Sequence, residues 1–159
     1  EISCSLVGSE MCIRDRGRVR VRRVAIAETL LESTDGNVTV RNSDLADGKL
    51  ATYDGEIKVS GSILSRISLN VTDGDMNLTD VTIDEGNANL KAGNFTLDHA
   101  VFKSDYEIKN IEGNNTVWSA NLKYAHVRTA NGLNNISFDP QPSGVVLTMT
   151  TVDGDNVVE

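Results

Sequence analysis

The sequence predicts an all-β protein that folds as a single-domain parallel β-solenoid of about seven rungs, each rung being one turn of 19–20 residues. Three observations lead to this prediction. Glycines recur at a nearly constant spacing, apolar residues keep fixed positions relative to them, and apolar and polar residues alternate between them. One repeat of this length cannot bury its apolar side chains alone, whereas stacked repeats can.

The glycines define the repeat. Successive members are separated by 19, 19, 19, 20, 19 and 22 residues, and five of the seven follow an acidic residue. Asp-Gly is typical of a tight turn, because glycine adopts positive φ freely and aspartate tolerates it. We therefore predict structural turns at Gly36, Gly55, Gly74, Gly93, Gly113, Gly132 and Gly154.

Three apolar columns keep register with these glycines. Five residues before each glycine stand Leu31, Leu50, Leu69, Ala88, Ile108, Val127 and Met149. Four residues after each stand Val40, Val59, Leu78, Leu97, Val117, Ile136 and Val158. Nine residues after the first five stand Leu45, Leu64, Ile83, Phe102 and Leu122. Segments such as Val38-Thr39-Val40 alternate apolar and polar residues, which is the period of a β-strand.

Hairpins are the alternative to stacked rungs. Asp-Gly between strands is a strong hairpin signal, and a series of hairpins would give an antiparallel β-sandwich. Hairpins do not require equivalent residues at a fixed 19-residue register, however. Stacked rungs do require it, because each residue lies over its equivalent one turn earlier. The column pattern therefore favours the solenoid.

The pattern weakens toward the C-terminus. Two residues after the glycine, the column changes from apolar to Asn115, Asn134 and Asn156. These residues could form an asparagine ladder, or they could mark a shifted register in which Trp118 or Val157 supplies the apolar contact. We favour the shifted register for residues 113–118. Because proline cannot donate to a strand ladder, Pro140 and Pro142 predict a loop over residues 139–144 that interrupts the last rung.

The first 16 residues, EISCSLVGSEMCIRDR, resemble a translated sequencing-adapter read-through of the kind found in metagenomic fragments. We expect this segment to be an artefact, disordered or non-native. It holds both cysteines, Cys4 and Cys12, so cysteine chemistry is not expected. Residues 17–30 are predicted to be a lead-in segment that could form a first strand. The β-solenoid repeat domain is predicted over residues 31–159.

Composition and charge exclude several classes of function. The net charge is −8, although residues 17–23 carry four arginines. An acidic body repels phosphate backbones, so nucleic-acid binding is not expected. The sequence has no apolar run long enough to span a bilayer, and no secretion signal is visible.

Candidate chemistry is sparse. Stacked carboxylates could bridge calcium, which makes Asp35, Asp54, Asp73 and Asp75 weak candidates, but turn residues are the better interpretation. His99 and His126 lack a third ligand and are interpreted as ordinary surface or strand residues. The single tryptophan and the three tyrosines fall in different columns, so partial burial is expected. No catalytic residue, metal or cofactor is predicted.

The repeated phrase carries a family resemblance. STDGNVTV at 33–40, TYDGEIKV at 52–59, VTDGDMNL at 71–78 and TVDGDNVV at 151–158 resemble the TxDGDIxL repeats of the bacterial DUF4097 family. The phrase degrades at 92–95 and 113–118. The resemblance implies β-strand repeats, an adhesin label, and attachment to the cell envelope behind a membrane or helical region.

We accordingly expect a non-enzymatic β-repeat module of the bacterial cell surface or envelope, acting as an adhesin or interaction domain with protein or glycan partners. Two alternatives stay open. One is a carbohydrate-active β-helix enzyme, which would need converging carboxylates. The other is a structural or regulatory domain of a larger envelope-stress protein.

Overall fold

The computed structural model describes residues 2–4 and 8–159, and describes side chains from Arg16 onward except that of Ser119. It contains no helix over these residues, and therefore no helix able to cross a membrane. The strands that begin a turn are β1 (Ile2–Cys4), β3 (Val19–Arg22), β5 (Val38–Arg41), β7 (Ile57–Ser60), β10 (Phe95–Phe102), β12 (Asn115–Ala120), β14 (Asn134–Ile136) and β16 (Asn156–Val158). Those that complete a turn are β2 (Gly8–Asp15), β4 (Ala25–Asp35), β6 (Asp44–Asp54), β8 (Ile63–Asp73), β11 (Tyr106–Glu112), β13 (Leu122–Asn131) and β15 (Val145–Asp153), while β9 (Met76–Ala92) runs through both positions.

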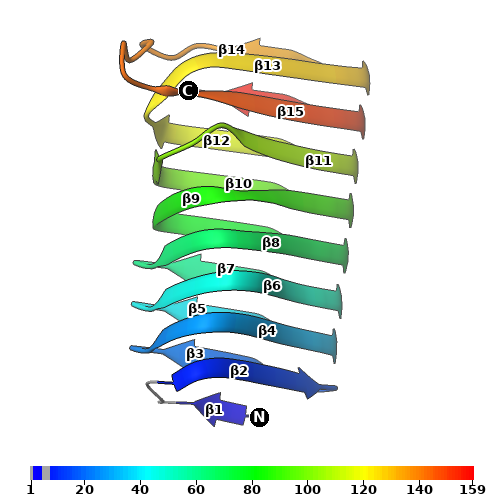
Figure 1. Cartoon of the computed structure of the whole chain (residues 1–159). Coiled ribbons are helices and arrows are strands. Elements are labelled where there is room, and N and C mark those ends of the chain that lie inside the picture. The colour runs from blue at the N-terminus through cyan, green and yellow to red at the C-terminus, as the bar shows by residue number, and fades with distance from the viewer. Residues whose placement is uncertain (1, 5–7) are drawn as a thin grey trace.

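The strands stack as a parallel solenoid (Figure 1). Val38, Ile57, Met76 and Phe95 lie in direct register on successive rungs, each 19 residues from the last. Every strand pair between described residues is parallel. The predicted solenoid is thus confirmed, and the antiparallel sandwich is wrong, because the columns of equivalent residues stack directly on one another.

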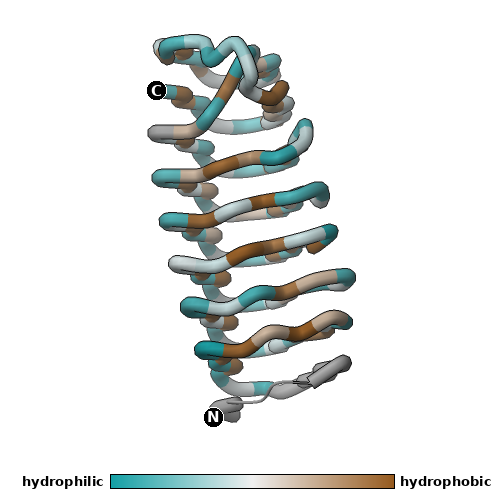
Figure 2. The backbone as a smooth tube through the Cα atoms, turned by 60° about the vertical axis from the view of Figure 1, so that its left-hand side comes forward, coloured by the Kyte–Doolittle hydropathy of each residue, from teal (hydrophilic) through white to brown (hydrophobic). Residues whose placement is uncertain are grey.

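The three apolar columns form the core, and apolar residues alternate with polar ones along the winding backbone (Figure 2). Seventeen of the nineteen column residues are buried at 0–2% exposure. The two exceptions are Val127, which is half-buried, and Ile136, which is 45% exposed. Both lie in the β13–β14 rung at the end of the stack, where no further rung covers them.

The predicted turn glycines all have positive φ, between 126° and 157°. A second constraint acts on the same residues, because the glycines stack directly on each other. A Cβ on Gly36 would lie 2.7 Å from the carbonyl oxygen of Gly17, and one on Gly74 would collide with the carbonyl of Gly55. Both backbone conformation and close approach therefore require glycine at this bend.

The solenoid begins earlier than the sequence boundary at residue 31. Gly17 stands one period before Gly36, and β3 and β4 form a complete rung that buries Val19, Val21 and Ile26. The lead-in interpretation of residues 17–30 is corrected accordingly, because β4 runs through residue 31 without a break. The strand predicted within it is present as β3.

Backbone strands also occur within residues 1–16. β1 pairs with β3, and β2 pairs with β4 from Gly8↔Ile26 to Asp15↔Ser33. The described part of this segment is therefore stranded rather than disordered. Its origin as adapter read-through stays a prediction, and the side chains of Cys4 and Cys12 lie outside the described residues.

The final rungs do not stack in sequence order. On one side of the solenoid β16 lies between β12 and β14, and on the other β15 lies between β11 and β13. Figure 1 shows β15 between β11 and β13. The chain therefore skips one level between β12 and β13, builds the end rung, and returns to fill the gap. The last two rungs are therefore stacked in the reverse of their sequence order.

Side chains hold the crossover in place. The Asn121 amide accepts from the Phe102 N–H at 2.6 Å and donates to the Phe102 carbonyl at 2.8 Å, as a neighbouring strand would. The carboxylate of Asp105 accepts from the Val146 N–H at 2.9 Å. The loop predicted around Pro140 and Pro142 is present, and it forms the return connection between β14 and β15.

The asparagines two residues after the glycine form a ladder, and the favoured shifted register is wrong. Asn115 pairs with Phe95 in the unshifted register, and its amide donates to Asn156 at 2.8 Å. Asn156 in turn donates to Asn134 at 2.8 Å. Trp118 is 40% exposed instead of filling the core. The amides satisfy one another along the stack, which makes a polar interior possible.

Candidate functional site

The acidic residues before the glycines lie in one exposed column. Asp35, Asp54 and Asp73 are in register on successive rungs, and Ala92 ends the run. All three aspartates face solvent. Asp75 lies beyond the glycine in a different column, so the structure does not gather the four carboxylates into one group. No cluster of three or more His, Cys, Asp or Glu suited to a metal occurs among the residues with described side chains.

Asp75 belongs to a ladder of side-chain oxygens that supports the glycine bend. Its Oδ1 accepts from the backbone N–H of Asn94 at 2.9 Å, one rung further on. In the same way, Asn94 Oδ1 accepts from the backbone N–H of Asn114. Asn114 Oδ1 accepts from the backbone N–H of Asp155. An Asp or Asn directly after the glycine thus satisfies a backbone donor of the next rung, which explains the recurrent Asp-Gly-Asp and Asp-Gly-Asn phrases.

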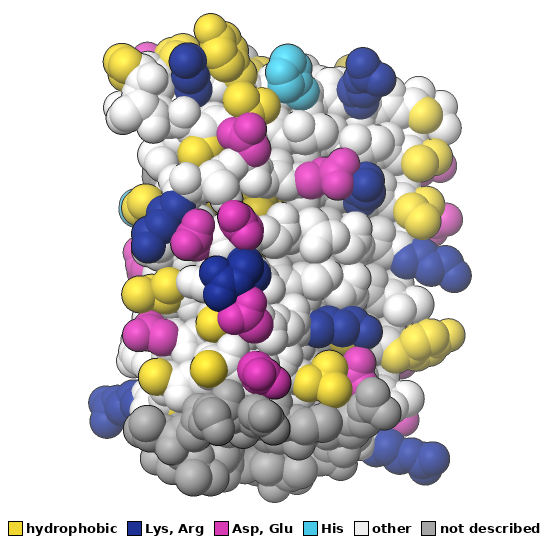
Figure 3. All heavy atoms as spheres, viewed as in Figure 1, with side chains coloured by type: hydrophobic (Ala, Val, Ile, Leu, Met, Phe, Trp, Pro, Cys, Tyr) yellow, Lys and Arg dark blue, Asp and Glu magenta, His cyan; other side chains and the backbone are white. Residues whose placement is uncertain are grey.

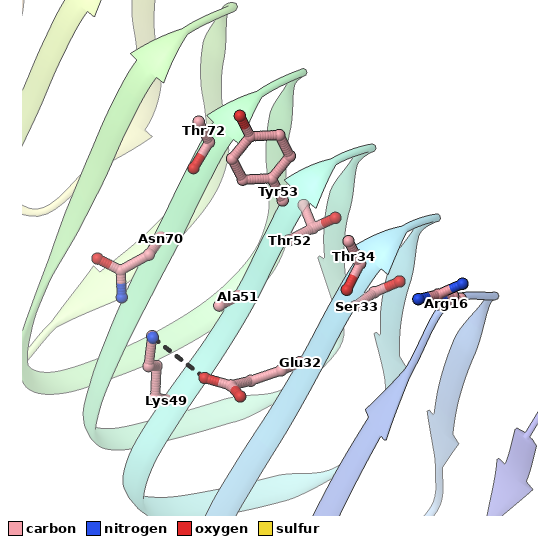
Figure 4. Close-up of a pocket in the computed structure, with 10 residues that line it drawn as sticks. All are labelled: Arg16, Glu32, Ser33, Thr34, Lys49, Ala51, Thr52, Tyr53, Asn70 and Thr72. Carbon is pink, nitrogen blue, oxygen red and sulfur yellow. Dashed lines mark hydrogen bonds and ion pairs between the residues drawn. The ribbon is translucent and has the colours of Figure 1, made fainter.

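A shallow polar depression lies on the outer face of β4, β6 and β8, which we call the long-strand face (Figure 4). Its volume is about 540 Å³. Ala51 lies in register between Glu32 and Asn70, and its short side chain leaves the hollow. Lys49 and Tyr53 flank Ala51 on the same outward side of β6, because side chains on a strand alternate between faces.

Hydrogen bonds order this face. Lys49 Nζ contacts Glu32 Oε1 at 3.1 Å, and Asn70 Nδ2 donates to Ser68 at 3.1 Å. Asn89 donates to Asn70 Oδ1 at 3.2 Å from the next rung. Basic and acidic side chains are interleaved over the long strands (Figure 3). The depression therefore offers amide, ammonium, guanidinium and carboxylate groups.

The shortest ion pair between described side chains lies at another bend of the solenoid. Arg66 contacts Asp47 through two hydrogen bonds, of 2.5 and 2.7 Å. The hydrogen bond from Arg66 holds the pKa of Asp47 below its ordinary value, and the same bond raises the pKa of Arg66. Both residues have positive φ and are exposed, so this pair stabilises a bend and does not form part of the depression.

The aromatic residues do not form one patch. Tyr53 is 62% exposed beside the depression, whereas Tyr106 is 3% exposed and packs against Phe102 with ring centroids 5.2 Å apart. Burial raises the pKa of the Tyr106 hydroxyl. Trp118 and Tyr124 lie on β12 and β13, away from Tyr53.

The two histidines are exposed and lie on different strands. His99 occupies a bend with φ of 54°, and its Nδ1 lies 2.8 Å from Asp98. His126 lies on β13 of the end rung. These positions are consistent with the surface role expected from the sequence.

Sequence reasoning missed the long-strand face. The signal was present in the column of outward residues Glu32, Ala51, Asn70 and Asn89, where a small residue is set among long polar ones. Which outward residues lie close to each other depends on the bends, which the repeat alone does not specify.

Comparison with known proteins gives a family and no closer relative. No curated protein and no solved structure matches the chain significantly. The family described as Toastrack DUF4097 matches residues 1–155, which is almost the whole chain. The parallel solenoid, the glycine bends and this match together place the chain in the DUF4097 Toastrack family.

Proposed function

We propose that this domain is a non-enzymatic interaction module of the bacterial cell envelope, an adhesin-type domain that binds a surface glycan or protein through the long-strand face. The observation that carries the proposal is the polar depression around Ala51, with Tyr53 exposed at its side. A rigid stack of rungs holds these groups in fixed positions, so little conformational entropy would be lost on binding.

The chemistry of the face suits a sugar more than an apolar ligand. An exposed tyrosine ring offers a flat apolar surface with a polar tip. Asn70 and Glu32 supply an amide and a carboxylate within the same depression. Hydroxyl groups of a glycan can both donate to and accept from such groups. A glycan is therefore the first ligand class to test, with a protein surface as the second.

The placement of the carboxylates supports a non-enzymatic role. The enzyme alternative relies on Asp54, Asp73 and Asp75 converging in a groove. Asp54 and Asp73 instead face solvent at a bend, and Asp75 is engaged by the backbone N–H of Asn94. The carboxylate in the depression, Glu32, is paired with Lys49. This pairing suits recognition of polar groups better than proton transfer.

A glycan array probed with the labelled domain tests the proposal. We expect binding to a restricted set of envelope-type glycans. The variants Tyr53→Ala and Asn70→Ala should weaken that binding by about tenfold or more, which corresponds to about 1.4 kcal/mol for a lost stacking or hydrogen-bond contact.

The matched control is Tyr124→Ala, which removes another exposed tyrosine from the end rung. It should leave glycan binding unchanged, and circular dichroism should show native strand content in all three variants. Full retention of binding in Tyr53→Ala would contradict the assignment of this face. A domain that binds neither glycans nor envelope proteins would contradict the function.

A further inference from the structure

Arginine side chains gather at one end of a different face, outside β3 and β5. Arg20, Arg22 and Arg41, together with Thr39, line a concavity of about 310 Å³. The side chains that alternate with them, including Val21 and Val40, are buried at 0–1% exposure. The period of two along each strand therefore fixes all three guanidinium groups on the outward side.

The register places like charges directly over each other. Arg22 pairs with Arg41, and Arg20 pairs with Thr39, across the parallel β3–β5 ladder. Neighbouring strands lie about 4.8 Å apart, so the Arg22 and Arg41 side chains start from adjacent points. Like charges directly opposite on neighbouring strands repel and destabilise a sheet.

Several basic residues elsewhere on the solenoid are paired with acids. Lys49, Lys58, Arg66 and Lys109 each contact a carboxylate within 3.1 Å. Among the residues with described side chains, no carboxylate forms an ion pair with Arg22 or Arg41.

The outward column of this pair holds no acid on the next two rungs. Beyond Arg41, the same outward column continues through Ser60 and Thr79 before it reaches Asp98, which contacts His99. Lys58, which stands in the neighbouring outward column of Arg20 and Thr39, is paired with Glu56. A concentrated positive patch therefore persists in a chain whose net charge is −8.

We propose that Arg20, Arg22, Thr39 and Arg41 form a binding site for a phosphate group. Guanidinium forks bind phosphate oxygens in pairs of parallel hydrogen bonds, and a threonine hydroxyl can donate one more. A bound phosphate group would offset the repulsion between the stacked arginines. The acidic body disfavours an extended nucleic acid, so the phosphate belongs to a small molecule or a lipid headgroup. This site is separate from the long-strand face and does not depend on its function.

Pyrophosphate titration followed by NMR of the arginine Nε–H signals tests the site. In low salt, we expect the signals of Arg22 and Arg41 to shift saturably. The double variant Arg22→Gln/Arg41→Gln should lose affinity by about tenfold or more, because both charge-assisted contacts are removed. Added salt should weaken binding in the wild type.

The matched control is Arg128→Gln, which removes an exposed arginine from β13 at the opposite end of the stack. It should bind pyrophosphate as the wild type does. Co-sedimentation with phosphatidylglycerol and phosphatidylcholine vesicles identifies the source of the phosphate. Binding to phosphatidylglycerol vesicles that the double variant loses would assign a lipid headgroup, whereas binding to pyrophosphate alone would assign a small molecule.

The proposal is overturned if neither pyrophosphate nor phosphatidylglycerol vesicles bind. It is also overturned if Arg128→Gln weakens binding as much as the double variant does. Tyr53→Ala serves as a second control, because its effect on glycan binding and its lack of effect on phosphate binding would separate the two sites.

Discussion

The rungs from Gly17 to Phe102 and the crossover rungs from Tyr106 to Val158 use the same register but different interiors. In the first region the column after the glycine is Val19, Val38, Ile57, Met76 and Phe95, all fully buried. In the second it is Asn115, Asn156 and Asn134, joined by amide hydrogen bonds. Where the rungs stack in sequence order, the column after the glycine is apolar. Where the order changes, the same column is polar.

This difference suggests how the crossover is specified. Apolar contacts are non-directional, so one apolar rung can cover another with little selectivity. Amide ladders are directional, and an unsatisfied buried amide is costly. A rung bearing Asn156 is therefore satisfied between Asn115 and Asn134, while an apolar rung in that position would leave both without their partner. The predictions below compare the two regions.

The largest effect is expected at the stacked glycines. In Gly74→Ala the new Cβ would collide with the Gly55 carbonyl at a bend with φ of 135°. We expect the free energy of unfolding to fall by about 4 kcal/mol. Gly132→Ala creates the same collision with Gly154, but the end rung can move outward, so a loss of about 1–2 kcal/mol is expected there. Chemical denaturation measures both, and equal losses would contradict the comparison.

Core truncation should show the next largest difference. Leu69 is fully buried between rungs, and Leu69→Ala should cost about 3 kcal/mol through lost contacts and a cavity. Ile136 occupies an equivalent apolar column but is 45% exposed. Ile136→Ala should cost less than about 1 kcal/mol, because little apolar surface is buried there. A similar cost in urea denaturation would mean that something covers the end rung in solution.

Replacing a ladder asparagine tests the polar interior. Asn156 accepts from Asn115 and Thr151 and donates to Asn134. Asn156→Leu should cost about 2 kcal/mol, because the buried amide of Asn115 loses a partner. In the regular stack, Met76→Leu at the equivalent position should cost less than about 1.5 kcal/mol. Hydrogen exchange should show faster opening of β14 only in Asn156→Leu. A stabilised Asn156→Leu would show that the ladder is not required.

The smallest effect is expected at the exposed Asp47–Arg66 pair. The pKa of Asp47 is lowered in the folded state, so its contribution is present above the ordinary value of 3.8 and is lost as pH falls through the lower folded value. Acid titration of stability should therefore be slightly steeper below pH 3.8 for the wild type than for Asp47→Asn. High salt should reduce the difference, and identical titrations would remove any role for the pair.

Much of the molecule follows from the sequence because the responsible rules are local. The period of two within each strand decides which side chains point inward, and the 19-residue spacing decides which of them stack. Glycine at each bend follows from positive φ and close approach. The rung from Gly17 to Asp35 follows the same local rules, since Gly17, Val19 and Val21 obey the same columns.

The candidate sites are less accessible from sequence. The hollow at Ala51 and the stacked pair Arg22 and Arg41 both require knowledge of which outward side chains share a flat face between bends. The positive-φ residues that create the other bends, such as Asn42 and Asp47, carry no uniform sequence signal. The faces of the solenoid therefore emerge only when the bends are placed.

The sequence by itself determined the rung length, the parallel register and the inward columns, since each depends on spacing along the chain. Only the tertiary structure decided the spatial order of the final rungs. Every rung has the same period and the same inward positions, so register alone cannot select the neighbour of a given rung. That choice depends on contacts between distant residues, such as Asn121 with Phe102 and Asp105 with Val146.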